Sequence, residues 1–315
     1  MYEAFIATLS PMLVMFLCLL VGFLLKKTGK LPEGSDVALS RLETYALVPA
    51  VSFSSFMQYC TVDSLKENYP IVIYASIAIL FSVGVAILLS YAFRIKDTYR
   101  RSVYQYALAF GNFGFMGNAI VPMILGGDEH LYYYLLFTLP LSFTIYLWGI
   151  VILTPKEHRK GNIIKNVFNF PMIAIFAGML VGVSGIGKIL PDFFITAVDS
   201  LKNCMGPVAM VLAGFVIGGY SFRDMLTDVR VYIASLLRLF ILPVLILLVL
   251  RLLGANNYII TLAFFAFATP LGLNTVVFPA AFGGETKTGA SMAMISNVLA
   301  VISLPVMYGL LNLWL

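Results

Sequence analysis

Two stretches of small and polar residues interrupt long apolar runs of this sequence, and together they could bind a small anion. Residues 109–122 hold three glycines and two asparagines, and residues 268–279 hold a Thr-Pro pair, a glycine and an asparagine. Gly weakens a helix because it loses backbone entropy, and Asn because its side chain competes for backbone partners. In lipid, a broken helix is tolerated only where it is buried in protein or lines a wet cavity. The two stretches therefore predict two helix breaks beside a binding site.

Each break predicts the start of a second half-helix, near Asn118 in the first stretch and near Asn274 in the second. Asn is among the best N-cap residues, and the first turn of a helix presents free N–H groups and a positive dipole end. Such an end attracts an anion without a cationic side chain. We expect side-chain hydrogen bonds to a carboxylate from Asn112, Asn118, Thr269 and Asn274, with exposed backbone amides around Gly114, Gly117 and Gly272.

Small and polar residues also permit helices in membranes to pack closely, and this is the alternative interpretation of the breaks. Two breaks at matching places favour a binding site over packing alone. The spacing of Gly111, Gly114 and Gly117 is a negligible signal for a nucleotide loop, because no strand precedes it and no acidic residue follows. We interpret Gly178-x-x-x-Gly182 and Gly214-x-x-x-Gly218 as close helix contacts.

Glu43 and Arg238 are the charges deepest within the apolar runs. Glu43 could be a proton-coupling carboxylate, and Arg238 could attract anions or pair with Glu43. Both lie toward the predicted cytoplasmic ends of their helices. Snorkelling to the membrane interface is therefore the interpretation that we favour for each of them.

The composition places these stretches in an integral membrane protein. The chain has 315 residues, of which 61% are hydrophobic and 11% charged, against about 25% charged in soluble domains. The net charge of +5 arises from basic residues in short loops, so nucleic acid is not an expected partner. The three cysteines stand singly, and we expect neither a metal site nor a cofactor. Signatures of enzymes are absent from the sequence, so an enzyme is not expected.

The apolar runs predict an all-α fold of ten transmembrane helices, at about 20 residues for each span. The predicted ranges are 5–25, 35–57, 70–93, 103–126, 131–154, 171–188, 192–219, 229–253, 257–283 and 288–314. Pro49, Pro207 and Pro243 are expected to kink their helices, with the nearby Ser52, Ser54 and Ser55 able to satisfy freed carbonyls or to face the cavity.

The distribution of Lys and Arg predicts that the odd-numbered loops are cytoplasmic and that both termini face outside. The fifth loop contributes Lys156, Arg159, Lys160 and Lys165 to this pattern. The even-numbered loops and their flanks hold only Lys66, Lys188, Lys202 and Arg251.

The two halves of the chain repeat each other weakly but in order. Pro49 corresponds to Pro207, and Pro122 with its following glycine pair corresponds to Pro279 with its own. The spacing between matched residues shortens slowly along the chain, which a chance match would not do. Five spans in each repeat place the second half upside down in the membrane. We therefore divide the chain into repeats 1–155 and 156–315, with the broken fourth and ninth helices crossing at the site.

With these residues in view, the chain resembles the auxin efflux carrier family in its compact bacterial form. The resemblance rests on four segments: residues 42–53 with Pro49, the Gly/Asn-rich break with Pro122, residues 238–243, and residues 296–305 after the Gly283-Gly284-Glu285 turn. It implies two inverted five-helix repeats and an elevator-type motion. Spans 1, 2, 6 and 7 would form a scaffold, expected to dimerise, and spans 3–5 and 8–10 the moving domain.

The chain also departs from the family pattern. Plant members carry a long hydrophilic loop between the halves and a proline at each crossover. Here the loop is residues 154–170 only, and Pro270 fits the second crossover while Phe113 and Gly114 stand at the first. Bacterial relatives are associated with malate and malonate, so the implied substrate is a small carboxylate rather than auxin.

The sequence thus predicts a secondary or potential-driven carrier of a small organic anion in the cell membrane. The nearest alternative is a sodium-coupled carrier of the bile-acid type, which would need cation ligands near both breaks, where this chain offers carbonyls, Asn and Thr. A membrane receptor without transport is a third possibility, and a membrane enzyme a fourth. Sodium dependence of flux, saturable flux and product formation would distinguish them.

Overall fold

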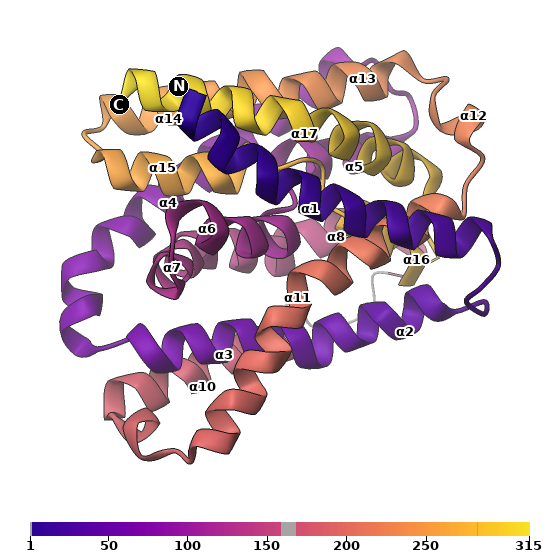
Figure 1. Ribbon diagram of the computed structural model, residues 1–315. Helices are drawn as coiled ribbons and strands as arrows, with labels where there is room; N and C mark the ends of the chain where they lie inside the picture. Colours follow the sequence, from indigo (N-terminus) through magenta and orange to yellow (C-terminus); the bar gives the residue numbers. More distant parts are fainter. Residues whose placement is uncertain (1, 159–167, 282) are drawn as a thin grey trace.

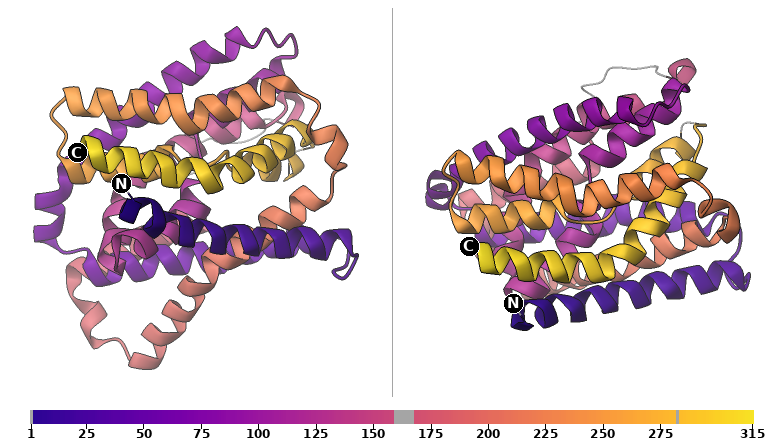
Figure 2. Two further views of the ribbon diagram at one scale, coloured as in Figure 1. Left: turned by 45° about the horizontal axis from the view of Figure 1, so that its top comes forward. Right: turned by 90° about the horizontal axis from the view of Figure 1, so that it is seen from above.

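The computed structural model describes residues 2–158, 168–281 and 283–315. Helices dominate the described chain, and no strand longer than an isolated bridge forms within it. Lys156 is described, but Arg159, Lys160 and Lys165 of the orientation argument and Phe282 of the ninth predicted range lie outside the described residues. The N- and C-termini lie at the same end of the molecule in all three views (Figures 1 and 2).

Six continuous helical runs within the described ranges are long and apolar enough to cross a membrane. They are α1 (Tyr2–Lys27), α4 (Val62–Ala92), α7 to α8 (Asp128–Leu153), α11 (Asp192–Gly218), α13 to α14 (Val229–Leu252) and α17 (Lys287–Trp314). Shorter apolar helices are Phe113–Leu125, α10 (Phe170–Ser184) and α15 (Asn257–Phe267). Further short helices are α2 (Ser35–Leu42), α3 (Val48–Tyr59), α5 (Thr98–Ala109) and α16 (Asn274–Ala281), and α6 (Asn118–Leu125) is the second part of the run Phe113–Leu125.

These helices occupy the ranges predicted from the sequence, with different ends. Helix α4 begins at Val62 rather than at residue 70, because the hydroxyl of Thr61 accepts a hydrogen bond from the backbone N–H of Ser64 at 3.0 Å and caps it. Pro70 then lies inside α4. Short helical turns also form outside the predicted spans, at η4 (Lys156–His158) and α12 (Phe222–Met225), and at the end of the sixth one, at η5 (Ile186–Ile189).

Four membrane helices contain a wide π-helical turn. These turns are η1 (Glu43–Leu47), η2 (Phe113–Gly117), η3 (Ile145–Gly149) and η6 (Leu237–Ile241). Pro49 and Pro243 follow η1 and η6 directly, at the second residue of α3 and of α14. A proline ring clashes with the carbonyl four residues before it, and a widened turn relieves that clash. Pro207 lies inside α11 without such a turn.

Glycines bring two pairs of helices into backbone contact. A methyl group at Gly22 of α1 would overlap the carbonyl of Val211, and one at Gly214 of α11 would overlap the carbonyl of Leu19. Helices α10 and α3 meet in the same manner, because a methyl group at Gly182 would lie 2.5 Å from the carbonyl oxygen of Phe56. The structure therefore confirms that Gly178-x-x-x-Gly182 and Gly214-x-x-x-Gly218 mark close helix contacts.

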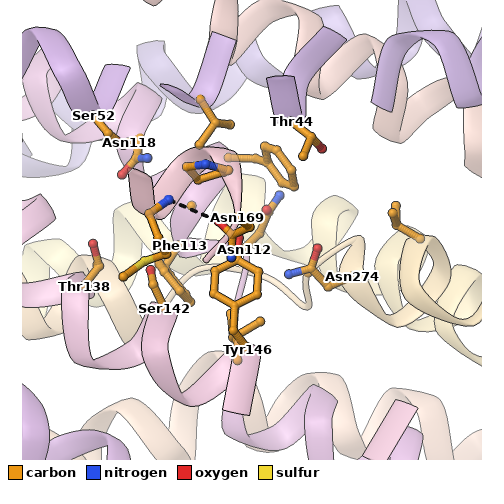
Figure 3. Close-up of a pocket in the computed structure, with 18 of the residues that line it drawn as sticks. Thr44, Ser52, Asn112, Phe113, Asn118, Thr138, Ser142, Tyr146, Asn169 and Asn274 are labelled. Carbon is orange, nitrogen blue, oxygen red and sulfur yellow. Dashed lines mark hydrogen bonds between the residues drawn. The ribbon is translucent and has the colours of Figure 1, made fainter. Parts of the chain in front are cut away.

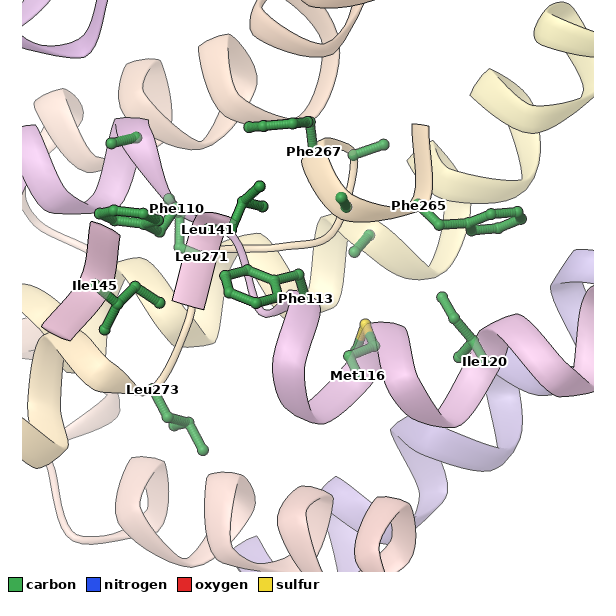
Figure 4. Close-up of a cluster of buried hydrophobic side chains, with 14 of the residues drawn as sticks. Phe110, Phe113, Met116, Ile120, Leu141, Ile145, Phe265, Phe267, Leu271 and Leu273 are labelled. Carbon is green, nitrogen blue, oxygen red and sulfur yellow. The ribbon is translucent and has the colours of Figure 1, made fainter. Parts of the chain in front are cut away.

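The two broken helices cross each other in the middle of the molecule. Gly111 and Leu271 form an isolated antiparallel bridge, and the backbone N–H of Asn112 donates to the carbonyl of Pro270 at 2.7 Å. Large apolar side chains of both breaks pack around this point, with Phe110 and Leu271 close together (Figure 4). Extended backbone inside a membrane protein needs such partners, and here each break supplies them to the other.

The first break lies earlier than the sequence predicted. Helix α5 ends at Ala109, and the second half-helix begins at Phe113, after Asn112. The carbonyl of Asn112 accepts from the N–H groups of Met116 and Gly117, so the glycine-containing segment folds into the wide turn η2 rather than staying open. The α-helix α6 does begin at Asn118, as predicted, but the wide turn η2 extends this half-helix back to Phe113. The second prediction is correct, because α16 begins at Asn274.

Candidate functional site

A cavity of about 190 Å³ lies beside the crossing, between the broken helices and α2, α3, α7, α10 and α11 (Figure 3). No charged side chain lines it among the described residues. Its polar lining consists of Ser40, Thr44, Ser52, Asn112, Asn118, Thr138, Ser142, Tyr146, Asn169 and Asn274. Ligand sites are commonly apolar clefts with a few placed polar groups, and this cavity has that character.

Two asparagines of the lining carry side-chain atoms with no hydrogen-bond partner. Asn112 is 3% exposed and its amide Nδ2 is unpaired, and Asn118 is 5% exposed with an unpaired Oδ1. A buried polar atom without a partner costs about 1–3 kcal/mol. A ligand with a carboxylate and a hydroxyl or acid proton would supply an acceptor for the first and a donor for the second. Asn112 is the N-cap of the second half-helix, and Asn118 is the first residue after its wide turn η2.

Asn274 is held in position by a neighbour from the other broken helix. Its Nδ2 donates to the hydroxyl oxygen of Tyr106 at 2.9 Å, and Tyr106 is buried. The amide therefore lines the cavity in a fixed orientation at the first residue of α16 (Figure 3). The N-terminal ends of both second half-helices face the same cavity, as anion binding at helix N-termini requires.

Three of the predicted contact residues do not line this cavity. Thr269 is buried and its hydroxyl donates to the carbonyl of Ala266 at 3.4 Å, while the carbonyl of Pro270 accepts from Asn112. Gly117 leaves room for the hydroxyl of Tyr134, which a methyl group there would overlap. These residues therefore stabilise the crossing.

The remaining glycines of the breaks have two different environments. A methyl group at Gly272 would lie 3.2 Å from the carbonyl oxygen of Gly111, so this position permits the backbones to approach. A methyl group at Gly114 would meet no atom within 4 Å. Gly114 also lines the cavity. Its missing side chain therefore leaves open space in the site.

Arg238 and Glu43 are both fully buried, so the interpretation that they snorkel to the interface is wrong. The predicted pairing between them is absent as well. Arg238 instead donates from Nη1 to the carbonyls of Leu108 at 3.1 Å and Ala109 at 3.4 Å, and its guanidinium lies 5.6 Å from the ring centroid of Phe267. Neither carboxylate oxygen of Glu43 has a hydrogen-bond partner, and Glu43 does not line the cavity.

Several polar residues of the lining were not predicted, among them Thr44, Thr138, Ser142, Tyr146 and Asn169. Thr44 and Thr138 lie inside helices and donate to carbonyls of the preceding turn, which is common for Thr in any membrane helix. Their sequence positions therefore carry no signal for a site. Of the three serines that the sequence allowed to face the cavity, Ser52 lines it, whereas Ser54 and Ser55 do not. The hydroxyl of Ser54 donates to Asp199 Oδ1 at 2.6 Å instead.

Two further cavities adjoin the site. One of about 510 Å³ is lined by Asn118 together with Lys202 and Asp128. Lys202 Nζ lies 2.7 Å from Asp128 Oδ2, so this ion pair joins α11 to the start of α7. The other, of about 680 Å³, shares Ser40 with the site and is lined by two basic residues, Lys26 and Arg41, and one acidic residue, Asp36. We name them the Lys202 cavity and the Lys26 cavity.

A sequence model of a family described as membrane transport protein matches residues 7–162 and 157–308 of this chain. The chain belongs to the auxin efflux carrier family. Membership in this family makes it a membrane transporter, and the resemblance drawn from its sequence is confirmed. Together with its apolar helices, this shows a multi-pass membrane protein. No curated protein matches the chain.

Proposed function

We propose that this transporter carries a small organic anion, a carboxylate such as malate or malonate, by secondary or potential-driven transport. The observation that carries the proposal is the cavity at the crossing. It joins the N-terminal ends of two half-helices to unpaired amide atoms of Asn112 and Asn118, without a charged side chain in its lining. A carboxylate is the ligand that such an arrangement favours.

The proposed mechanism is an elevator-type alternating access by two inverted five-helix repeats. Helices α1 to α3, α10 and α11 would form the scaffold, and α4 to α8 with α13 to α17 the moving domain. The cavity supports this division because its lining comes from both groups, so motion of one against the other would open and close it. The tight glycine contacts of α1 with α11 and of α3 with α10 support a rigid scaffold, which we expect to dimerise.

The orientation is part of the proposal. Both termini lie at the same end of the molecule, as an even number of spans requires (Figure 1). The Lys and Arg pattern places that end outside the cell membrane. The Lys26 cavity would then connect the site with the cytoplasm, and its basic residues would attract anions from that side.

Sodium coupling is the alternative that the crossing disfavours. A sodium ion at the breaks would need backbone carbonyls as ligands, since no Asp or Glu lies in either break. The carbonyls of Leu108 and Ala109 at the end of α5 already accept from the guanidinium of Arg238. The membrane potential remains as a driving force, at about 2.3 kcal/mol per charge and 100 mV, or roughly fifty-fold accumulation or expulsion of a monoanion.

The experiment that tests the function measures charge movement by the purified protein in proteoliposomes. Malate, malonate, citrate, pyruvate and an indole acid are supplied in turn, with and without sodium. We expect a saturable current for one of them, and its loss in the Asn118→Ala/Asn274→Ala double variant while the protein stays folded. No current and no labelled uptake for any acid, with binding still detectable, would support a receptor instead.

A further inference from the structure

Arg238 carries a positive charge in the interior of the protein, directly behind the crossing. Among the described residues, the charged side chains that are more than nine-tenths buried are Arg238, Glu43 and Lys202. Lys202 pairs with Asp128, whereas no described carboxylate forms an ion pair with Arg238. Its Nη1 donates to two carbonyls and its guanidinium faces an aromatic ring, while Nε and Nη2 have no hydrogen-bond partner among the described residues.

The guanidinium lies against the first break from the side away from the cavity. A methyl group at Gly111 would lie 2.6 Å from Arg238 Nη2 and 2.8 Å from the carbonyl oxygen of Thr269. Gly111 itself lines the cavity, so one residue of backbone separates the charge from the space that a ligand would occupy. Arg238 does not touch the substrate and is a positioning residue.

The partners of Arg238 all belong to the proposed moving domain. Arg238 lies in η6, the carbonyls that it binds close α5, and Phe267 ends α15. The negative end of the α5 dipole holds the charge in place, and arginine keeps its proton when buried because its intrinsic pKa is so high. Glu43 in η1 and Lys202 in α11 belong to the proposed scaffold.

We infer that Arg238 is a built-in counter-ion that travels with the substrate anion through the membrane. This inference rests on the proposed elevator transport of an anion. The charge buried inside a moving domain that holds a monoanion would then sum to zero, and the interior of the empty domain would carry one positive charge. The transported charge in a complete cycle is still that of the substrate. What Arg238 sets is the step at which the membrane potential acts: the return of the empty carrier.

A mobile cation of this kind would also explain how the site works without sodium. In a sodium-coupled carrier the coupling ion offsets the charge of the anion in the low-dielectric interior. Here the guanidinium supplies that compensation permanently. An anion is therefore bound without a co-ion, and a neutral analogue of the substrate gains nothing from the site. Arg238 thus favours anions over neutral ligands, and it also determines which step of the transport cycle depends on voltage.

The first test needs no substrate and uses the wild-type protein in a planar or supported bilayer. Voltage steps should move the empty carrier and give a transient charge displacement that saturates at both extremes of voltage. The displacement should persist in Arg238→Lys, which keeps the charge, and disappear in Arg238→Gln. Lys202→Gln is the matched control, because it removes a buried cation from the proposed scaffold and should leave the displacement in place. A wild-type carrier with no displacement would overturn the inference.

The second test separates the two half-cycles with labelled pyruvate as a monoanion and labelled malonate as a dianion in proteoliposomes under a potassium diffusion potential. Exchange of pyruvate uses only the loaded carrier and should be insensitive to voltage in the wild type. It should become voltage-dependent in Arg238→Gln, approaching about fifty-fold per 100 mV if the charge crosses the whole field. Malonate exchange should depend on voltage in both proteins, more steeply in the variant.

The outcomes distinguish this inference from the proposed function. Flux of neither acid in the wild type, with no flux of any other acid in the panel, would overturn the proposed function. Flux with the same voltage dependence of exchange in the wild type and Arg238→Gln would overturn only the role of Arg238. If Arg238→Gln does not fold, wild-type pyruvate exchange that depends strongly on voltage is enough to reject the inference.

Discussion

The backbone N–H of Asn112 donates to the carbonyl oxygen of Pro270 at 2.7 Å, and this bond joins the two broken helices where they cross. The same residue leaves its amide Nδ2 unpaired in a cavity of about 190 Å³. Its backbone therefore fixes the crossing while its side chain remains available to a ligand. The hydrogen bond at the crossing holds Asn112 in one position, and a binding site needs its side chains held in this way.

Gly114→Val should lower transport without unfolding the protein. The new side chain would enter the open space of the cavity, and a few added carbons in a binding pocket change affinity by about tenfold or more. The measurement is labelled uptake of the acid that gives a current. Gly84→Val is the matched control, because a methyl group there also meets no atom within 4 Å but points out from the exposed side of α4. Equal uptake by both variants would place the ligand elsewhere.

Gly111→Ala should destabilise the fold, although it lies three residues from Gly114 in the same motif. The added methyl group would lie 2.5 Å from Thr269 Oγ1 and 2.8 Å from the Thr269 carbonyl oxygen, and overpacking of this kind costs about 1–3 kcal/mol. Thermal unfolding in detergent checks this, with Gly114→Ala alongside. That second variant should be as stable as the wild type or up to about 1 kcal/mol more stable, since Ala favours a helix over Gly. A lower unfolding temperature for Gly114→Ala than for Gly111→Ala would contradict the crossing geometry.

Asn274→Ala should reduce the affinity for the transported acid about tenfold, by removal of one hydrogen bond to a charged group. Tyr106→Phe removes only the hydroxyl that holds Asn274, at 2.9 Å, and should cost less. The measurement is the substrate concentration at half-maximal uptake for both variants, with the unfolding temperature as a check on folding. If Tyr106→Phe weakens uptake as much as Asn274→Ala does, Asn274 contributes only to folding, by its hydrogen bond to Tyr106, and does not contact the substrate.

Transport should be independent of sodium. Arg238 occupies the carbonyls of Leu108 and Ala109 that a coupling cation would otherwise use. Uptake driven by a potassium diffusion potential should therefore be equal in sodium and in N-methylglucamine buffers. A severalfold stimulation by sodium, with a saturable dependence on its concentration, would restore the sodium-coupled alternative.

Thr28→Cys should be protected from an impermeant thiol reagent in intact cells, and Asp63→Cys should react. Both residues are exposed, Thr28 after the end of α1 and Asp63 in the first turn of α4. The background replaces Cys18, Cys60 and Cys204, which are free. The reverse labelling pattern would place both termini in the cytoplasm and show that the Lys and Arg pattern was misread.

The sequence predicted the crossing and part of the cavity lining because both depend on residue types with strong local preferences. Gly, Asn and Pro break helices in lipid, and Asn112, Gly114, Asn118, Gly272 and Asn274 all line the cavity. The exact position of the first break did not follow, since Gly114 and Gly117 fold into the wide turn η2 and leave only residues 110–112 outside a helix. A π-turn arises from packing and has no sequence signature of comparable strength.

The direction in which the charged side chain of Arg238 points could not be predicted either. Sequence gives the depth of Arg238 within its span, and at that depth its side chain is long enough to reach water. Its actual direction is set by the carbonyls that α5 leaves free at Ala109, which exist only because the fourth helix breaks there. Thr269 and Pro270 were misplaced for a related reason: their polar groups bond to neighbouring backbone, the Thr269 hydroxyl to the carbonyl of Ala266 and the Pro270 carbonyl to the N–H of Asn112.

Asn118 lines both the site and the Lys202 cavity, so at this point the wall between the two spaces is a single side chain. Water that fills a cavity from one side of the membrane holds it close to the potential of that side. If the site and the Lys202 cavity fill from opposite sides, the electric field concentrates across the thin wall at Asn118. A displacement of a few ångströms at the crossing would then carry a charge through most of the membrane potential. Small motions of the moving domain would be enough to couple transport to voltage.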